Sequence, residues 1–82
     1  MKKEKLLSKI VGGVKNVSFN DMVRLIEVYG FRLDRIKGSH HIFVHPTIQE
    51  LINIQNAKGK VKPYQVKQIL SLIEKYNLQM EK

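Results

Sequence analysis

The histidines of this chain all lie in one short stretch, KGSHHIFVHP, which runs from residue 37 to residue 46. An imidazole ring can take up or release a proton near neutral pH, and it is also a common metal ligand. The stretch therefore raises two kinds of chemistry, acid–base catalysis and metal binding, which place different demands on the positions of the rings.

Metal binding fits the spacing poorly. Gly38 and Ser39 predict a tight turn, and the residues after them predict a strand that ends at Pro46, because proline donates no ladder hydrogen bond. On such a strand His41 and His45 share a face but stand about 13 Å apart, too far to share one ion through bonds of ~2 Å. The remaining histidine points to the other face, and the chain has no cysteine. We therefore expect no metal and no other cofactor.

Alternation along this strand decides which histidine is free to react. Successive side chains point to opposite faces, so Ile42 and Val44 share one face, while His41 shares the other with Phe43 and His45. We expect packed helices to cover the face of Ile42 and Val44. That arrangement leaves His41 on the open face of the sheet.

The turn before His41 would shape its surroundings. Gly38 and Ser39 allow backbone conformations that bulkier residues resist, and His40 lies at the turn itself. His41 is therefore the candidate general acid or base, with Gly38, Ser39 and His40 shaping the site. The alternative is an ordinary exposed strand histidine with no chemical role.

Positive charge is concentrated at the two ends of the chain. The net charge is +8; residues 1–17 contain five lysines and one glutamate, and residues 56–82 contain six lysines and two glutamates. Clustered lysine suits a polyanion such as nucleic acid, and the alternative is that the charge serves solubility. Among the aromatic side chains, Phe43 and Tyr64 could stack on bases or pack against protein.

A basic segment containing Lys58, Lys60 and Lys62 precedes Pro63, which is well tolerated at the first position of a helix. Lysine charge and unpaired amides at a helix start would act together on a phosphate. Lys37, beside the turn, would add a further phosphate contact. The spacing is not that of a P-loop, and the alternative is a solvated loop.

The elements that position these residues follow from hydrophobic periodicity. Helical spacing of apolar residues predicts helices over residues 3–11, over 19–29 and from 63 onward. Ser18 and Asp21 resemble a capping box at the start of the second helix, and Gly30 is a typical stop after it. Apolar alternation and short apolar runs predict strands over residues 31–36, 40–45 and 51–55. Short loops make these strands antiparallel. Two helices must cover one face of the sheet, and we expect Ile52 and Ile54 to point to that covered face.

Composition bounds the class of protein. A chain of 82 residues is large enough for one domain with one modest core. The absence of cysteine rules out a disulfide framework and suits a reducing cytosol. Apolar runs fall short of the roughly 20 residues that a membrane span needs. We expect a soluble cytoplasmic protein.

These motifs together resemble the HicA family of toxins, small proteins of type II toxin–antitoxin systems. The resemblance is carried by KGSHHIFVHP at residues 37–46, KGKVKPYQV at residues 58–66 and KQIL at residues 67–70. It covers about residues 18–78. The set is fairly specific, although a Gly-Ser-His turn alone would be weak.

The resemblance implies an α+β fold with a double-stranded-RNA-binding-like α-β-β-β-α core, in which a three-stranded antiparallel sheet has helices on one face. It implies a metal-independent ribonuclease that cleaves mRNA through one histidine, which is His41 here, and a HicB-type antitoxin that covers the site. Because short family members begin near Ser18, residues 1–17 would be an N-terminal extension with a short helix, and residues 18–82 a single HicA-like domain.

Two other functions stay open at this point. One is a non-catalytic RNA-binding module that reads double-stranded shape with its lysines. The other is a protein-interaction domain. The oligomeric state stays open as well.

Overall fold

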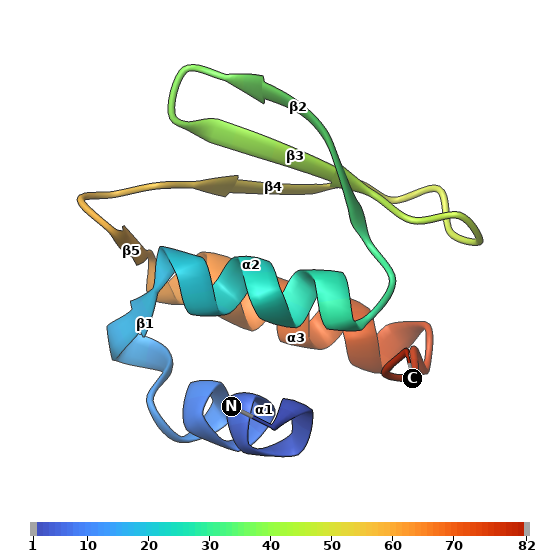
Figure 1. Cartoon of the computed structure of the whole chain (residues 1–82), viewed down its shortest axis with the longest axis horizontal. Coiled ribbons are helices and arrows are strands. Elements are labelled where there is room, and N and C mark those ends of the chain that lie inside the picture. Colours follow the sequence, from blue (N-terminus) through green and yellow to red (C-terminus); the bar gives the residue numbers. More distant parts are fainter. Residues whose placement is uncertain (1, 82) are drawn as a thin grey trace.

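The computed structural model describes residues 2–81 and arranges helices and a sheet in layers (Figure 1). In chain order the elements are α1 Lys3–Gly12, the 3-10 turn η1 Val14–Asn16, β1 Val17–Ser18, α2 Phe19–Val28, β2 Arg32–Lys37, β3 His40–Val44, β4 Ile52–Gln55, β5 Lys60–Val61 and α3 Pro63–Lys75. Strands β2, β3 and β4 form an antiparallel sheet in that order, and β1 pairs with β5. This order confirms the predicted α+β fold with an α-β-β-β-α core.

The helices lie on one side of the three-stranded sheet. Helices α2 and α3 face the sheet, and α1 packs against α2 on the side away from it (Figure 1). Within residues 2–81, no helix has the length and apolar character needed to cross a membrane.

Helix α2 begins and ends where its sequence predicts. The Ser18 Oγ accepts a hydrogen bond of 3.1 Å from the Asp21 N–H, which satisfies an amide that the helix start would otherwise leave unpaired. Gly30 follows the helix with a φ of +94°, in the left-handed region that glycine adopts without strain. The cap and the stop therefore fix the position of Phe19, which is buried in the first turn.

A bulge in β2 explains an irregularity in its sequence. Leu33 pairs with Phe43 and Ile36 pairs with His41, and the register shifts between them at Asp34. One extra residue lets Leu33 and Ile36 face the same side although three positions separate them. Phe31 and Leu33 alternate in the sequence, and Ile36 breaks this alternation because of the bulge.

The helices cover the opposite face of the sheet from the one predicted. In the pairing of β3 with β4, His41 lies opposite Ile54 and Phe43 lies opposite Ile52. Phe43, Ile52 and Ile54 are all buried in the core. His41 therefore lies on the covered face, and the prediction that it lies on the open face is wrong.

The prediction chose the wrong face of the sheet because the sequence of β3 is ambiguous. Ile42 and Val44 are apolar on one side, and Phe43 is apolar on the other, so alternation alone cannot orient this strand. The cross-strand register decides it, because Ile42 lies opposite Asn53 and not opposite a core isoleucine. Ile42 is buried by its neighbours, but it lies outside the main core cluster.

Helix α1 belongs to the same hydrophobic core as the rest of the chain. Leu6 is 0% exposed and Ile10 is 1% exposed, and both belong to one cluster with residues of α2, the sheet and α3. On its surface, the Lys9 Nζ lies 2.9 Å from a carboxylate oxygen of Asp21. The N-terminal segment is therefore a packed part of the fold.

The basic segment before α3 contains a short strand that the sequence does not predict. Val17 pairs with Val61, and Ser18 pairs with Lys60. Both valines are buried in the core. The pairing attaches the basic segment to the end of the N-terminal segment and to the start of α2.

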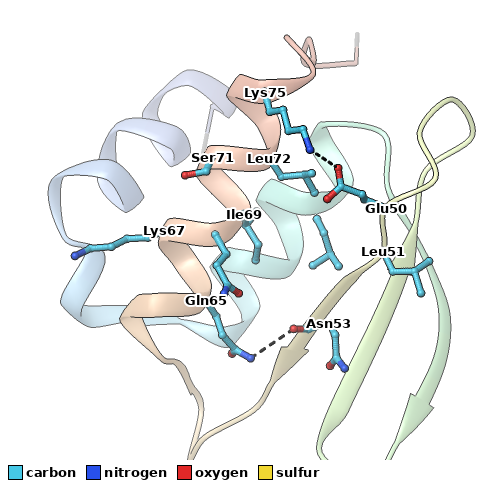
Figure 2. Close-up of a pocket in the computed structure, with 11 residues that line it drawn as sticks. Glu50, Leu51, Asn53, Gln65, Lys67, Ile69, Ser71, Leu72 and Lys75 are labelled. Carbon is cyan, nitrogen blue, oxygen red and sulfur yellow. Dashed lines mark hydrogen bonds and ion pairs between the residues drawn. The ribbon is translucent and has the colours of Figure 1, made fainter.

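Gln65 is a buried polar side chain that completes the outer edge of β4. Its Oε1 accepts from the Gln55 N–H at 3.3 Å, and its Nε2 donates to the Asn53 carbonyl at 3.4 Å, a contact drawn in Figure 2. The side-chain amide takes the place of the peptide group of a neighbouring strand, so it blocks part of an edge that would otherwise invite pairing.

The burial of α1 predicts a large loss of stability on truncation of Leu6. We expect Leu6→Ala to lower the free energy of unfolding by about 2–5 kcal/mol, because it leaves a cavity in a packed core. The matched control is Val11→Ala on the same helix, which is 55% exposed and should change stability by less than ~0.5 kcal/mol. Urea denaturation measures both, and similar small effects would contradict the docking of α1.

The Lys9–Asp21 pair predicts a dependence of stability on pH. The hydrogen bond from Lys9 holds the pKa of Asp21 below its ordinary value of 3.8, although burial opposes this shift. A carboxyl with a lowered folded-state pKa stabilises the protein above its unfolded pKa, and this contribution is lost as pH falls through the folded pKa. Because the pair is partly exposed, we expect Lys9→Gln to cost under ~1 kcal/mol at about pH 7, and this cost should shrink as the pH falls below 3.8. Urea denaturation at neutral and at acidic pH tests this, and a cost that is undiminished in acid would contradict it.

Candidate functional site

His41 lies beneath the first turn of α2, near the start of β3. Its ring meets the Phe19 ring edge to face, with centroids 4.7 Å apart and planes at 66°. Its Nδ1 is buried without a hydrogen-bond partner, a state shared by no other side-chain nitrogen or oxygen within residues 2–81. Because the residue is only half-buried, Nε2 is the ring nitrogen left to face solvent.

His45 lies on the same strand face, but both of its nitrogens are engaged. Its Nδ1 accepts from the Thr47 N–H at 3.1 Å, which leaves its Nε2 to donate to the Tyr29 carbonyl, also at 3.1 Å. Its ring lies 4.8 Å from that of Phe31, and a Cβ on Gly30 would approach its Nε2 to 3.0 Å. His45 therefore fastens the end of β3 to the end of α2.

His40 and Lys37 lie at the correct end of the sheet but on its other face. They pair across the β2–β3 hairpin, so alternation directs them away from the face of His41. His40 is exposed, and its Nδ1 lies 3.1 Å from the Asn53 Oδ1. Gly38 between them has a φ of +59°, as the predicted turn requires. Of the predicted site residues, these two are separated from the His41 ring by the sheet itself.

Backbone contacts bring the turn, the basic segment and α2 together around His41. The Ser39 carbonyl accepts from the Asn56 N–H at 3.0 Å, and the Phe19 N–H donates to the Gly59 carbonyl at 2.8 Å. These two bonds close the end of the molecule around the imidazole. Ser39 and the basic segment therefore do share the site with His41.

The predicted RNA-binding lysines of the basic segment surround a strained turn. Lys58 and Gly59 have φ values of +55° and +83°, and the residues on either side, Ala57 and Lys60, exchange backbone hydrogen bonds of 2.9 and 3.1 Å. Two positive φ values in a two-residue hairpin define a type I′ turn, in which a lysine Cβ is unfavourable. Lys58, Lys60 and Lys62 are all exposed, so the turn holds their charge outward.

Some residues at this end were missed from sequence, and one aromatic was misjudged. Asn16 accepts from the Lys60 Nζ at 2.5 Å; no motif marks it, because the contact depends on the unpredicted pairing of β1 with β5. In the sequence Phe19 has only the spacing of a core residue, so nothing there indicates that its ring packs against His41. Phe43 is 1% exposed and cannot stack on bases, whereas Tyr64 is 56% exposed and can.

A groove of about 590 Å³ lies away from this site, between β4 and α3 (Figure 2). At its rim Glu50 accepts from the Tyr76 hydroxyl and lies 3.2 Å from the Lys75 Nζ. The Tyr76 bond, and then Lys75, hold the pKa of the Glu50 carboxyl below its usual value, so this carboxylate stays ionised beside the Lys75 ammonium. No histidine lines the groove, and within residues 2–81 no group of three His, Cys, Asp or Glu side chains could hold a metal ion.

The strained turn predicts that Lys58→Asn stabilises the protein. Asparagine tolerates a positive φ better than lysine, and Asn-Gly is the preferred pair for a type I′ turn. We expect the free energy of unfolding to rise by about 0.5–1 kcal/mol. The control is Lys37→Asn, an exposed lysine without a positive φ, which removes the same charge and should give no gain. Equal gains in thermal denaturation would mean that charge, and not strain, is responsible.

The geometry can be set beside known proteins. Residues 19–74 match the family model described as the HicA toxin of bacterial toxin–antitoxin systems. Comparisons with curated proteins and with solved structures gave no significant match. The matched region includes the His41 strand, the basic segment and most of α3, and it makes up more than half of the chain. The chain therefore belongs to the HicA family of bacterial toxin–antitoxin toxins.

Proposed function

We propose that this protein is a metal-independent endoribonuclease that cleaves mRNA in the cytoplasm, and that His41 is its catalytic residue. The observation that carries the proposal is the state of the His41 ring. Its buried Nδ1 lacks a hydrogen-bond partner, whereas His45 uses both nitrogens to hold the fold together. A histidine with no structural hydrogen bond, at the rim of a basic surface, is available for proton transfer.

In the proposed reaction, His41 Nε2 takes the proton of a ribose 2′-hydroxyl. The 2′-oxygen attacks the adjacent phosphorus, the bond to the 5′-oxygen breaks, and the products are a 2′,3′-cyclic phosphate and a 5′-hydroxyl. The imidazolium formed in the first step can supply the proton that the leaving oxygen needs. DNA lacks the internal nucleophile, so this chemistry selects RNA.

The exposed lysines supply the electrostatic part of the proposal. Lys58, Lys60 and Lys62 follow one another along the segment that closes over the His41 end of the sheet. Their charge would bind the RNA backbone and offset the charge that develops on the phosphate. Lys37 emerges on the opposite face, so its contact would be to RNA that wraps around the β2–β3 turn.

A HicB-type antitoxin is the partner that family membership suggests. A surface that binds RNA phosphates through lysines also suits acidic side chains of a protein inhibitor. We propose that the antitoxin binds over the His41 end of the molecule and blocks access of RNA. Residues 18–82 would carry the nuclease, with residues 1–17 as an extension packed against it.

The test is cleavage of a defined RNA oligonucleotide by the purified protein. We expect His41→Gln to lower the cleavage rate by about 10²–10⁴-fold, the range that general acid–base catalysis supplies. Cleavage should persist in a chelator, leave a 2′,3′-cyclic phosphate, and fail where the ribose at the cleaved bond is a 2′-deoxyribose. His40→Gln, on the other face, is the matched control and should cleave normally.

Folding and binding must be followed in the same variants. Because His41 packs against Phe19, a thermal melt and RNA binding should show that His41→Gln is folded and still binds. If His41→Gln cleaves as fast as the unaltered protein, the assignment of His41 is wrong. If the unaltered protein binds RNA but never cleaves it, the non-catalytic RNA-binding module is the correct function.

A further inference from the structure

Two lysine-rich stretches of the chain contain no acidic residue. They are residues 5–20 and residues 51–73, and together they hold seven of the lysines: Lys5, Lys9, Lys15, Lys58, Lys60, Lys62 and Lys67. The fold brings these stretches together, because β1 of the first pairs with β5 of the second and η1 packs against α3. Two acid-free segments thus form one continuous surface.

A groove of about 570 Å³ lies where the N-terminal segment meets α3. It is lined by Val11, Gly12, Gly13, Val14, Lys15, Pro63 and Lys67. Figure 2 shows the Lys67 side chain leaving α3 away from Glu50, on the side of the N-terminal segment. The groove therefore has one lysine from the N-terminal segment and one from α3.

The charge of this groove is not neutralised by the protein. Some basic side chains of the protein do have acidic partners, as in Lys9 with Asp21 and Lys75 with Glu50. Within residues 2–81, neither Lys15 nor Lys67 forms an ion pair, and both are exposed. Uncompensated charge in a concave surface attracts a polyanion.

The groove continues directly from the basic segment at the proposed catalytic site. Ser18 pairs with Lys60, and the Lys60 Nζ donates to the Asn16 Oδ1 at 2.5 Å. Lys15 is the next residue before Asn16 in the chain. The Lys60 side chain therefore contacts the residue that follows Lys15, which lines the groove.

We infer that Lys15 and Lys67 form a second RNA subsite, which binds the backbone of single-stranded RNA beyond the cleaved bond. RNA is favoured because an RNA strand at His41 has further phosphates to place, and this surface offers the adjacent positive charge. Residues 11–15 lie before the region matched by the family model. The subsite thus combines Lys15, which lies outside the matched region, with Lys67, which lies inside it. The inference rests on the proposed function for its substrate.

The experiment measures how binding of an uncleavable RNA depends on salt. Fully 2′-O-methylated RNA lacks the nucleophile, and oligonucleotides of roughly 4 and roughly 12 nucleotides span the usual range of single-strand site sizes. For the long oligonucleotide we expect Lys15→Gln/Lys67→Gln to reduce the slope of log K against log salt by about 1.4, since each lysine contact contributes about 0.7. For the short oligonucleotide at the catalytic end the slope should not change.

Two matched variants make the result decisive. Lys75→Gln removes a lysine from the far end of the same helix and should leave both slopes unchanged. Lys58→Gln/Lys60→Gln should lower both slopes, because these lysines belong to the catalytic end. A long-RNA slope that Lys15→Gln/Lys67→Gln leaves unchanged overturns the subsite, and so does an equal reduction for short and long RNA. An unchanged slope would mean that the groove binds another partner, such as an acidic protein.

Cleavage of unmodified RNA is measured in parallel, so that the two proposals fail separately. An unaltered protein that shows the length-dependent slopes but cleaves nothing supports the subsite and overturns the nuclease. One that cleaves RNA while its long-RNA slope is insensitive to Lys15 and Lys67 supports the nuclease and overturns the subsite.

Discussion

The backbone pairing of Val17 with Val61 joins parts of the chain that are far apart in sequence. In the chain, β1 lies between α1 and α2, and β5 lies within the basic segment that precedes α3. Both side chains are buried, so the short ladder is supported by core packing. The bond from the Phe19 N–H to the Gly59 carbonyl extends this junction to the start of α2. Because Phe19 covers His41, the environment of the imidazole depends on a pairing of very short strands.

Much of the fold was predictable because its signals are local. The cap at Ser18, the stop at Gly30 and Pro63 at the start of α3 mark helix boundaries through the chemistry of single residues. The pairing of β1 with β5 was not predictable, since two-residue strands carry no period. The orientation of β3 was not predictable either, because apolar side chains occupy both of its faces and only the register with Ile52 and Ile54 selects one.

The site could be predicted in its members better than in its arrangement. The Gly-Ser turn and the resemblance it carries indicate His41, and the basic segment is visible as a run of lysines. Lys37 and His40 are neighbours of the site in sequence, yet they point to the other face. Asn16 and Lys15 are distant in sequence, yet they adjoin the basic segment. Alternation of side chains places Lys37 and His40 on the other face, whereas the pairing of β1 with β5 brings Lys15 and Asn16 beside the basic segment. Proximity along the chain is therefore a poor guide to which residues lie together.

Under the proposed function, the covered position of His41 suits catalysis better than the predicted open position would. A histidine on an open sheet face is hydrated at both nitrogens and can rotate freely. Substrate binding must then restrict the side chain to one orientation, which costs conformational entropy. Here the edge-to-face contact with Phe19 and the burial of Nδ1 hold the ring with one nitrogen outward. The unpartnered nitrogen costs about 1–3 kcal/mol of stability. Orientation gained before the substrate arrives is one way in which such a cost serves function. His45, which follows β3, meets Phe31 in the same edge-to-face manner, but hydrogen bonds to both of its nitrogens remove that freedom. The two histidines therefore differ in their hydrogen bonds and not in the aromatic ring that packs against them.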